Sequence, residues 1–165
     1  MKYTKLASIL SLATAIYADD SWKSLTPDTT LDGGITDMGS TTMGLTIERM
    51  SDTKVKRDVS SDGLDQHCSV DGNLAVTLAE GILYDSQGRV GAIVSNNQFQ
   101  FDGPPPQSGS IYAAGWAVSE DGYLALGDST QFYECLSGDF YNLYNADIAD
   151  QCNPIQIKLV ELIDC

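Results

Sequence analysis

The chain has 165 residues, of which 42% are hydrophobic and 8% aromatic, and this composition is typical of one globular domain. Its formal net charge is −14 at pH 7. Such an acidic chain is unsuited to bind nucleic acid or anionic lipid, because both of those partners carry the same sign of charge.

The first 18 residues have the order of a secretory signal. Lys2 and Lys5 precede an apolar run from Leu6 to Ile16, and small residues lead up to Ala18. A run of about 11 apolar residues is too short to cross a bilayer, which needs about 20. We predict cleavage after Ala18, a secreted product and no membrane association once the signal is removed.

A dibasic pair, Lys56-Arg57, follows in a polar stretch and is typical of a kexin-type processing site; the alternative is an exposed pair without a role. Residues 19–57 contain few large apolar side chains and many serines and threonines. They are therefore predicted to form a disordered pro-segment and, in a fungal secretory pathway, to accept O-linked mannose. Beyond it, Arg89 and Lys158 are the only Lys or Arg against sixteen carboxylates, so this part carries the acidic charge.

After a short linker at residues 58–67, a compact domain is predicted at 68–165. Its apolar or alternating runs are short, are spaced by about ten residues and are separated by turn-forming residues, which predicts an all-β domain. The predicted strands are 74–78, 81–84, 90–94, 98–101, 111–118, 123–126, 131–135, 140–144 and 155–163. A faint repeat relates residues 88–99 to 122–132, which favours a β-trefoil over the alternative, a β-sandwich.

Four cysteines, an even number in a secreted chain, predict a disulfide-stapled domain. Three pairings are open. If the β-structure closes on itself, its first and last strands are neighbours, which favours Cys68 with Cys165 and Cys135 with Cys152. A zinc site is not expected, because no two cysteines form a CxxC pair and His67 is the only histidine. We expect no metal and no cofactor.

No motif singles out a catalytic acid, base or nucleophile, so the chain is predicted not to be an enzyme. Aromatic side chains could instead stack on sugar rings. The candidate glycan contacts are Tyr112, Trp116 and Tyr123, and the alternative for each is packing in the core.

Several sequence features together resemble the PIR family (proteins with internal repeats) of yeast cell-wall mannoproteins. The spacing of the four cysteines resembles the family's terminal signature, and a pro-segment ending in Lys-Arg is also similar. Four segments look like its carboxyl-terminal domain: Gly81–Arg89, Gln98–Gln107, Tyr112–Trp116 and Cys135–Tyr144.

The resemblance implies a structural constituent of the fungal cell wall, incorporated into the glucan network and contributing to wall organisation. Family members carry repeats of the form Gln-Ile-Gly-Asp-Gly-Gln, whose glutamine becomes ester-linked to β-1,3-glucan. This chain lacks a recognisable repeat, because Asp62-Gly63 is followed by Leu64 and Gln66 lies too late to match. Gln66 is the candidate attachment residue. Retention by disulfides, or by association with polysaccharide or other wall proteins, is the alternative, and a non-catalytic, lectin-like glycan-binding module is the alternative function.

Overall fold

The computed structural model describes residues 19–50 and 63–165; the predicted signal and the processing residues Ala18, Lys56 and Arg57 lie outside them. One short 3-10 helix, η1, precedes eleven strands in the described part of the chain. These elements are η1 (Ser21–Ser24), β1 (Met43–Arg49), β2 (Gln66–Cys68), β3 (Ala75–Ala79), β4 (Ile82–Asp85), β5 (Val90–Ile93), β6 (Phe99–Asp102), β7 (Trp116–Val118), β8 (Leu124–Leu126), β9 (Phe132–Ser137), β10 (Phe140–Tyr144) and β11 (Cys152–Ile163).

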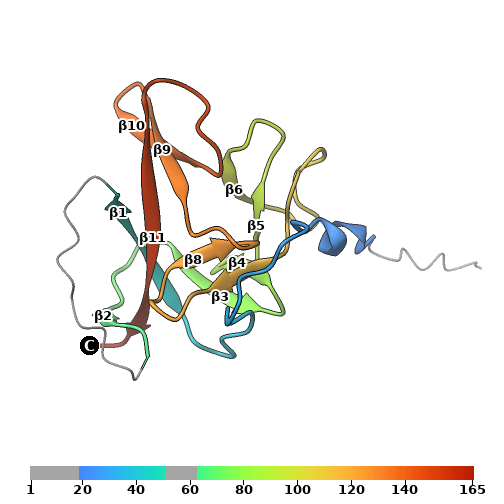
Figure 1. The fold of residues 1–165 in the computed structure, drawn as a ribbon. Coiled ribbons are helices and arrows are strands. Elements are labelled where there is room, and N and C mark those ends of the chain that lie inside the picture. The colour runs from blue at the N-terminus through green and yellow to red at the C-terminus, as the bar shows by residue number, and fades with distance from the viewer. Residues whose placement is uncertain (1–18, 51–62) are drawn as a thin grey trace, which may run out of the picture.

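Nine of the strands form one sheet, in which β11 is the longest strand and runs upright on the left of Figure 1, in red. The order is β10-β9-β11-β1-β3-β4-β5-β6, and β2 pairs in parallel with the end of β11. An isolated bridge between Gln98 and Tyr144 joins the region of β6 to that of β10, so the sheet nearly closes on itself. β7 and β8 form a separate two-stranded sheet. This architecture confirms the all-β class, whereas neither the trefoil nor the sandwich is confirmed.

Glycine-containing turns set the register of two hairpins. Only Glu80 and Gly81 lie between the last paired residues of β3 and β4, and their φ values are 50° and 76°. Two successive positive φ values make a type I′ turn, whose twist matches that of the flanking strands. Between β9 and β10 the pair is Gly138 and Asp139, with φ of 71° at the glycine. Each turn therefore places consecutive strands side by side in antiparallel register.

The main core fills the space enclosed by the curled sheet and the β7–β8 hairpin. Every second residue of β11 from Ile155 to Leu159 is fully buried, as expected of a strand with one face toward the core. Trp116, Phe132 and Met43 are the largest fully buried side chains. A smaller cluster forms around Trp22, with Ile82, Val90, Ala92, Ala113 and Ala114.

The prediction of a disordered pro-segment is wrong for its described part, residues 19–50, which we call the N-terminal segment. Trp22 is buried in the smaller cluster, and β1 pairs with β11 from Met43 opposite Glu161 to Arg49 opposite Ile155. The segment is poor in apolar residues but pairs its backbone with a strand more than 100 residues away. Its order therefore comes from tertiary pairing, which local composition does not report.

Part of the predicted linker lies in a strand. The predicted linker, residues 58–67, ends inside β2, where Gln66 and His67 pair with Glu161 and Leu162 of β11. No helix in the described ranges is long and apolar enough to cross a membrane.

Candidate functional site

The two disulfides lie at opposite ends of β11, the longest strand of the sheet. Cys68 of β2 is joined to Cys165, with Cα atoms 5.5 Å apart, and Cys135 of β9 is joined to Cys152 of β11. Cys135 and Cys152 are direct register partners in the antiparallel ladder. This is the disulfide pairing predicted above from the expected adjacency of the first and last strands. All four cysteines of the chain are thus used internally, and none is free.

Trp116 is a core residue, so its assignment as a glycan contact is wrong. Its side chain has no exposed surface, and its indole N–H donates a hydrogen bond of 2.9 Å to the carbonyl oxygen of Gly91. Its ring lies 4.8 Å from that of Phe99 and is stacked on that of Phe132. The physical reason is that an apolar body with one polar atom is best placed where the core surrounds the ring and a backbone carbonyl accepts the N–H.

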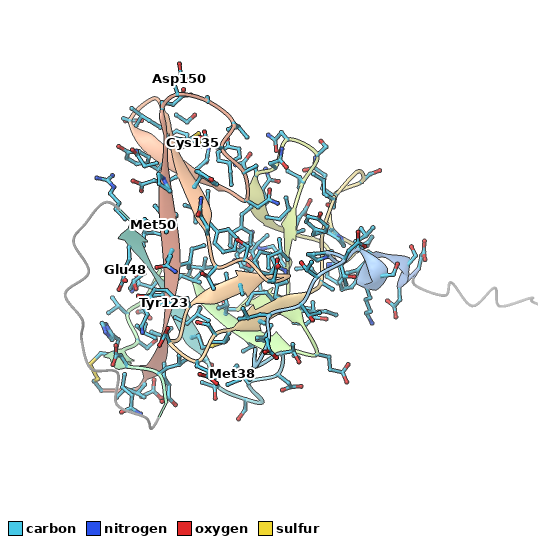
Figure 2. The ribbon with its side chains drawn as sticks, in the orientation of Figure 1. Met38, Glu48, Met50, Tyr123, Cys135 and Asp150 are labelled. Atoms are coloured by element: carbon cyan, nitrogen blue, oxygen red, sulfur yellow. A yellow bond between two sulfur atoms is a disulfide. The ribbon has the colours of Figure 1, made fainter. Side chains whose placement is uncertain are left out.

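Tyr123 is half-buried and already engaged on two sides. Its hydroxyl donates a hydrogen bond of 2.8 Å to Glu48 of β1, and the two side chains are labelled together in Figure 2. The ammonium of Lys158 lies 5.0 Å from the centre of its ring, a cation–π arrangement. The structure therefore does not bring Tyr123 into a common site with Tyr112.

Tyr112 is the one predicted glycan contact that lines a described cavity. The cavity, which we call the Asn145 pocket, has a volume of about 200 Å³. Ligand sites for drug-sized molecules start near ~300 Å³, so this pocket has room for a single sugar ring rather than for an oligosaccharide. Its walls are formed by Pro27, Thr29, Tyr112, Leu126, Asp128, Ser129, Gln131, Phe132 and Asn145.

One polar atom of the Asn145 pocket is a hydrogen-bond acceptor that no other group of the pocket pairs with. The side-chain oxygen of Asn145 is buried and has no hydrogen-bond partner in the described structure. Asp128 accepts a hydrogen bond of 2.9 Å from the hydroxyl of Thr29, and the side-chain amide of Gln131 donates to the hydroxyl of Tyr133. A buried acceptor without a partner is unfavourable, and a hydroxyl donor entering the pocket would relieve it.

Sequence reasoning missed the polar residues of this pocket other than Tyr112, namely Thr29, Asp128, Ser129, Gln131 and Asn145. Asp128 and Gln131 belong to a polar run that directly follows a buried strand, and such a loop end is a signal that could have been used. Asn145 follows β10, and only the bridge between Gln98 and Tyr144 brings the end of β10 to the other side of the sheet. No local pattern indicates that closure.

Gln66, the candidate attachment residue, lies exposed at the start of β2. Its side-chain amide nitrogen donates a hydrogen bond of 2.9 Å to a carboxylate oxygen of Glu161. Two residues later, Cys68 ties this edge of the sheet to Cys165. The side chain is thus accessible while its backbone is fixed, as an attachment point on the surface of a rigid domain requires.

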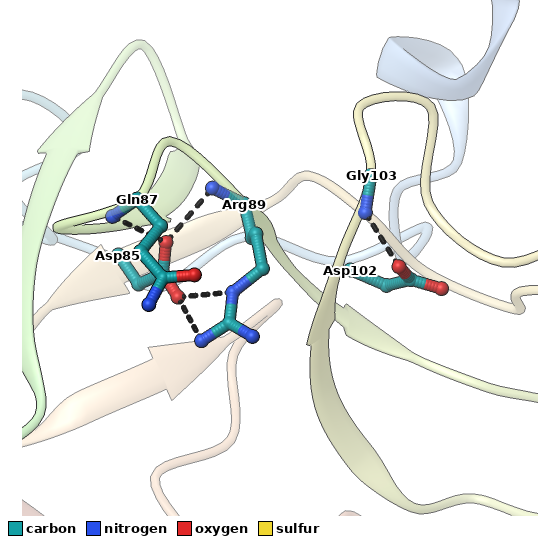
Figure 3. Close-up of polar contacts among 5 residues, drawn as sticks. All are labelled: Asp85, Gln87, Arg89, Asp102 and Gly103. Atoms are coloured by element: carbon teal, nitrogen blue, oxygen red, sulfur yellow. Dashed lines mark hydrogen bonds and ion pairs between the residues drawn. The ribbon is translucent and has the colours of Figure 1, made fainter.

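The two buried carboxylates of the described residues, Asp85 and Glu134, are each paired with an arginine. Asp85 accepts hydrogen bonds from the backbone N–H of Gln87 and of Arg89, at 3.0 and 2.8 Å, and from the guanidinium of Arg89 (Figure 3). Burial by itself raises the pKa of Asp85, but these donors outweigh it and hold the pKa below its usual value. Glu134 pairs with Arg49 and raises the pKa of that guanidinium.

These pairs hold the fold together. Asp85 and Arg89 close the β4–β5 turn, and Arg49 and Glu134 connect β1 to β9 across β11. Within the described ranges, no three histidine, cysteine, aspartate or glutamate side chains are grouped so that they could hold a metal ion.

The chain is similar to known cell-wall proteins over its carboxyl-terminal part. A family model described as the cell wall mannoprotein PIR1-like, C-terminal domain, matches residues 81–155. Cell wall mannoprotein CIS3 of Saccharomyces cerevisiae is 60% identical over 101 residues, 61% of this chain and 44% of that relative. Cell wall protein PIR5 of the same species is 59% identical over 100 residues, 61% of this chain and 35% of that relative. The match thus covers less than half the length of either relative, and no solved structure matches.

Proposed function

We propose that the chain, whose residues 81–155 match the PIR1-like C-terminal domain of cell wall mannoproteins, is a secreted, non-catalytic constituent of the fungal cell wall. The observation that carries this proposal is the 60% identity to the cell wall mannoprotein CIS3 over 101 residues. The precursor is processed after Ala18 and after Arg57. The acidic, disulfide-stapled domain is then incorporated into the β-1,3-glucan network and contributes to wall organisation.

A non-catalytic role is supported by the state of the buried carboxylates. A glycosidase needs two carboxyl groups facing one sugar-binding cleft, one of them free to donate a proton. Asp85 and Glu134 are each held by an arginine, and neither lines the Asn145 pocket. Asp128, which does line it, is exposed and accepts a hydrogen bond from Thr29.

Two modes of retention in the wall follow from the chemistry of the surface. In the first, a glucan hydroxyl attacks the side-chain carbonyl carbon of Gln66, so that a C–O bond forms, the C–N bond breaks and ammonia leaves with the hydroxyl proton. In the second, the domain is held without a covalent bond. Retention by a disulfide to another protein has less support, because all four cysteines already pair within the chain.

Sequential extraction of intact walls tests these modes. We expect that reductant alone leaves the protein in the wall, and that mild alkali, which cleaves esters, releases it. Substituting Gln66→Ala should move the protein into the fraction that detergent extracts. Gln107→Ala is the matched control, since Gln107 is also an exposed glutamine. Release by reductant, or alkali-sensitive retention of Gln66→Ala, would contradict the ester at Gln66.

Glycan binding is a second candidate function, favoured by the unpaired oxygen of Asn145 beside Tyr112 in a pocket of about 200 Å³. Calorimetric titration with short β-1,3-glucan oligosaccharides tests it. Asn145→Ala and Tyr112→Ala are expected to abolish the binding heat, while Tyr123→Phe, outside the pocket, leaves it unchanged. Absence of heat in the unmodified protein at millimolar sugar would remove this function and leave the structural role intact.

A further inference from the structure

The hairpin of β7 and β8 lines a second cavity, which has a volume of about 480 Å³. We call it the hairpin groove, and its walls are residues 118–122, residues 63–65, Ile35, Met38 and Lys158. Segments far apart in sequence therefore meet in it. Its volume lies within the range of small-ligand sites, about 300 to 1,000 Å³, so it has room for a ligand larger than the Asn145 pocket accepts.

Backbone pairing and close packing fix the walls of the hairpin groove. Ile35 and Val118 exchange two backbone hydrogen bonds, at 2.9 and 2.8 Å. At the other end of the turn, the carbonyl oxygen of Gly122 accepts a hydrogen bond of 2.9 Å from the N–H of Leu159. A Cβ atom placed on Gly122 would come within 3.1 Å of Leu64 Cδ2, so this wall is closely packed as well. The groove is therefore formed before any ligand enters it.

The apolar side chains of the groove belong to the border of the main core. Val118 is buried within that core, and Met38 and Leu64 pack against it while they remain partly exposed. Ile35 is 46% exposed, although its backbone is paired. Apolar surface beside a cavity favours a ligand with an apolar part, because binding removes that surface from water.

Three exposed carboxylates, those of Asp65, Glu120 and Asp121, surround this apolar surface. Within residues 19–50 and 63–165, none of their side chains takes part in a hydrogen bond or an ion pair with the protein. Lys158 is the one cation among the residues that line the groove. Its ammonium donates to the backbone carbonyl oxygen of Asp121 and lies 5.0 Å from the ring centre of Tyr123. The groove therefore has an excess of negative charge, and its carboxylates are available to a ligand.

The charge and the lining of the groove select among classes of ligand. An anion would be repelled by the three carboxylates. A neutral glycan is disfavoured, because no aromatic side chain lines the groove to stack on a sugar ring. A ligand with both a cationic and an apolar part complements both features, and the net charge of −14 attracts it from a distance.

We propose that the hairpin groove binds a basic peptide segment of another protein, in which apolar side chains alternate with lysine or arginine. The apolar side chains cover Ile35 and Leu64, and the cationic groups pair with the carboxylates. Asp65 belongs to one wall of the groove and Glu120 and Asp121 to another, so an extended peptide with several cations reaches both walls. The apolar contacts supply most of the affinity, while the exposed charges supply the rate of association and the selectivity. This function is separate from retention in the wall.

Calorimetric titration of the secreted full chain with three synthetic hexapeptides tests the proposal. The repeats Leu-Arg, Ser-Arg and Leu-Glu supply both features, the cations alone and the apolar side chains with the opposite charge. We expect binding of the Leu-Arg peptide, binding at least tenfold weaker of the Ser-Arg peptide and no heat with the Leu-Glu peptide. Absence of heat with the Leu-Arg peptide at millimolar concentration, or equal binding of the two cationic peptides, would overturn the proposal.

A matched pair of charge variants separates the groove from the overall charge of the protein. Glu120→Gln/Asp121→Asn removes two carboxylates of the groove, whereas Asp147→Asn/Asp150→Asn removes two exposed carboxylates elsewhere. Both double variants change the net charge equally. Loss of two exposed ion pairs corresponds to roughly fivefold weaker binding of the Leu-Arg peptide, and we expect less than about a twofold change in the control. Equal weakening in the two variants would mean that the peptide responds to overall charge and not to the groove.

A second pair tests the apolar contact. Ile35→Ser should weaken binding of the Leu-Arg peptide by roughly tenfold, because it removes exposed apolar surface that the peptide covers. Ile111→Ser is the control, since Ile111 is 37% exposed and lies outside the groove. Circular dichroism verifies that each variant is folded, and the charge variants keep the test decisive if Ile35→Ser is not. An unchanged affinity in folded Ile35→Ser would overturn the proposal. Binding of short β-1,3-glucan oligosaccharides that Ile35→Ser abolishes would assign the groove to glycan instead.

Discussion

Asp85 is a buried carboxylate whose ionised form is favoured by the fold. Its side chain is 1% exposed, while that of Arg89, which donates to it, is 43% exposed. The carboxylate also accepts two backbone N–H bonds of the β4–β5 turn, so the charge, the turn and the hairpin register depend on one another. Because the guanidinium remains in contact with water, the pair avoids most of the desolvation that a fully buried ion pair incurs.

Substituting Asp85→Asn should destabilise the protein by about 2 kcal/mol, the magnitude for loss of a charge-assisted hydrogen bond in a partly buried site. The side chain of asparagine keeps one acceptor oxygen, but its NH₂ group replaces the other. That group cannot accept a hydrogen bond, so one set of N–H donors loses its partner. Asp102→Asn is the control, since Asp102 is exposed and accepts only the N–H of Gly103, at 2.7 Å (Figure 3). Denaturant unfolding of both variants measures the difference, and equal stability would contradict the role given to Asp85.

The lowered pKa of Asp85 also gives the direction of a pH effect. A group whose pKa is lower in the folded than in the unfolded state stabilises the fold above its unfolded value, near ~3.9 for aspartate. That contribution is lost as pH falls through the folded value. The stability gap between the unmodified protein and Asp85→Asn should therefore be full at neutral pH and shrink below about pH 4. If the difference in stability between the two proteins instead widened in acid, the lowered pKa of Asp85 would be contradicted.

At the scale of elements, the spacing of apolar residues along the chain predicted most of the strands. It did not predict the strands whose pairing partner is distant in sequence. All nine predicted strands correspond to β3 through β11, although 111–118 is a strand only from Trp116. The two that were missed are β1 and β2. β1 contains Gly44 and Thr46 and exposes most of its length, so its sequence has no continuous apolar run. Both strands form because their backbones pair with that of β11.

The two disulfides should differ in their effect on stability. Cys68 and Cys165 are separated by 97 residues, whereas Cys135 and Cys152 are separated by 17. In the chain-entropy model, a loop closed over the longer distance constrains the unfolded chain by about 4.7 kcal/mol and the shorter by about 3 kcal/mol. Cys68→Ala/Cys165→Ala should therefore lower the melting temperature more than Cys135→Ala/Cys152→Ala does.

Calorimetry of the two double variants, beside the unmodified protein, makes this comparison. Circular dichroism verifies that each variant keeps its β-sheet signal before melting. A larger loss from removing the Cys135–Cys152 bridge would mean that its position between β9 and β11, at directly paired residues, outweighs the loop-length effect.

At the scale of the whole molecule, charge opposes compaction. The net charge is −14, and beyond residue 57 two cations face sixteen carboxylates, so the folded domain repels itself. Raising the ionic strength from about 0.01 to 0.1 M shortens the screening length from about 30 to about 10 Å. We expect the melting temperature to rise by a few degrees over this range with sodium or potassium chloride alike. A fall would mean that the surface ion pairs contribute more than the repulsion.

Composition, cysteine spacing and the period of the apolar runs were sufficient to determine an acidic, disulfide-bonded, all-β domain and its resemblance to the cell-wall mannoproteins. These properties depend on residues close together in the chain, or on counts. Only the tertiary structure decided that the N-terminal segment belongs to the sheet, that Trp116 is enclosed in the core and that Asn145 meets Tyr112 in one pocket. Each of these depends on pairing between segments far apart in sequence, whose free energy is realised only when β11 and the closing sheet bring the partners together.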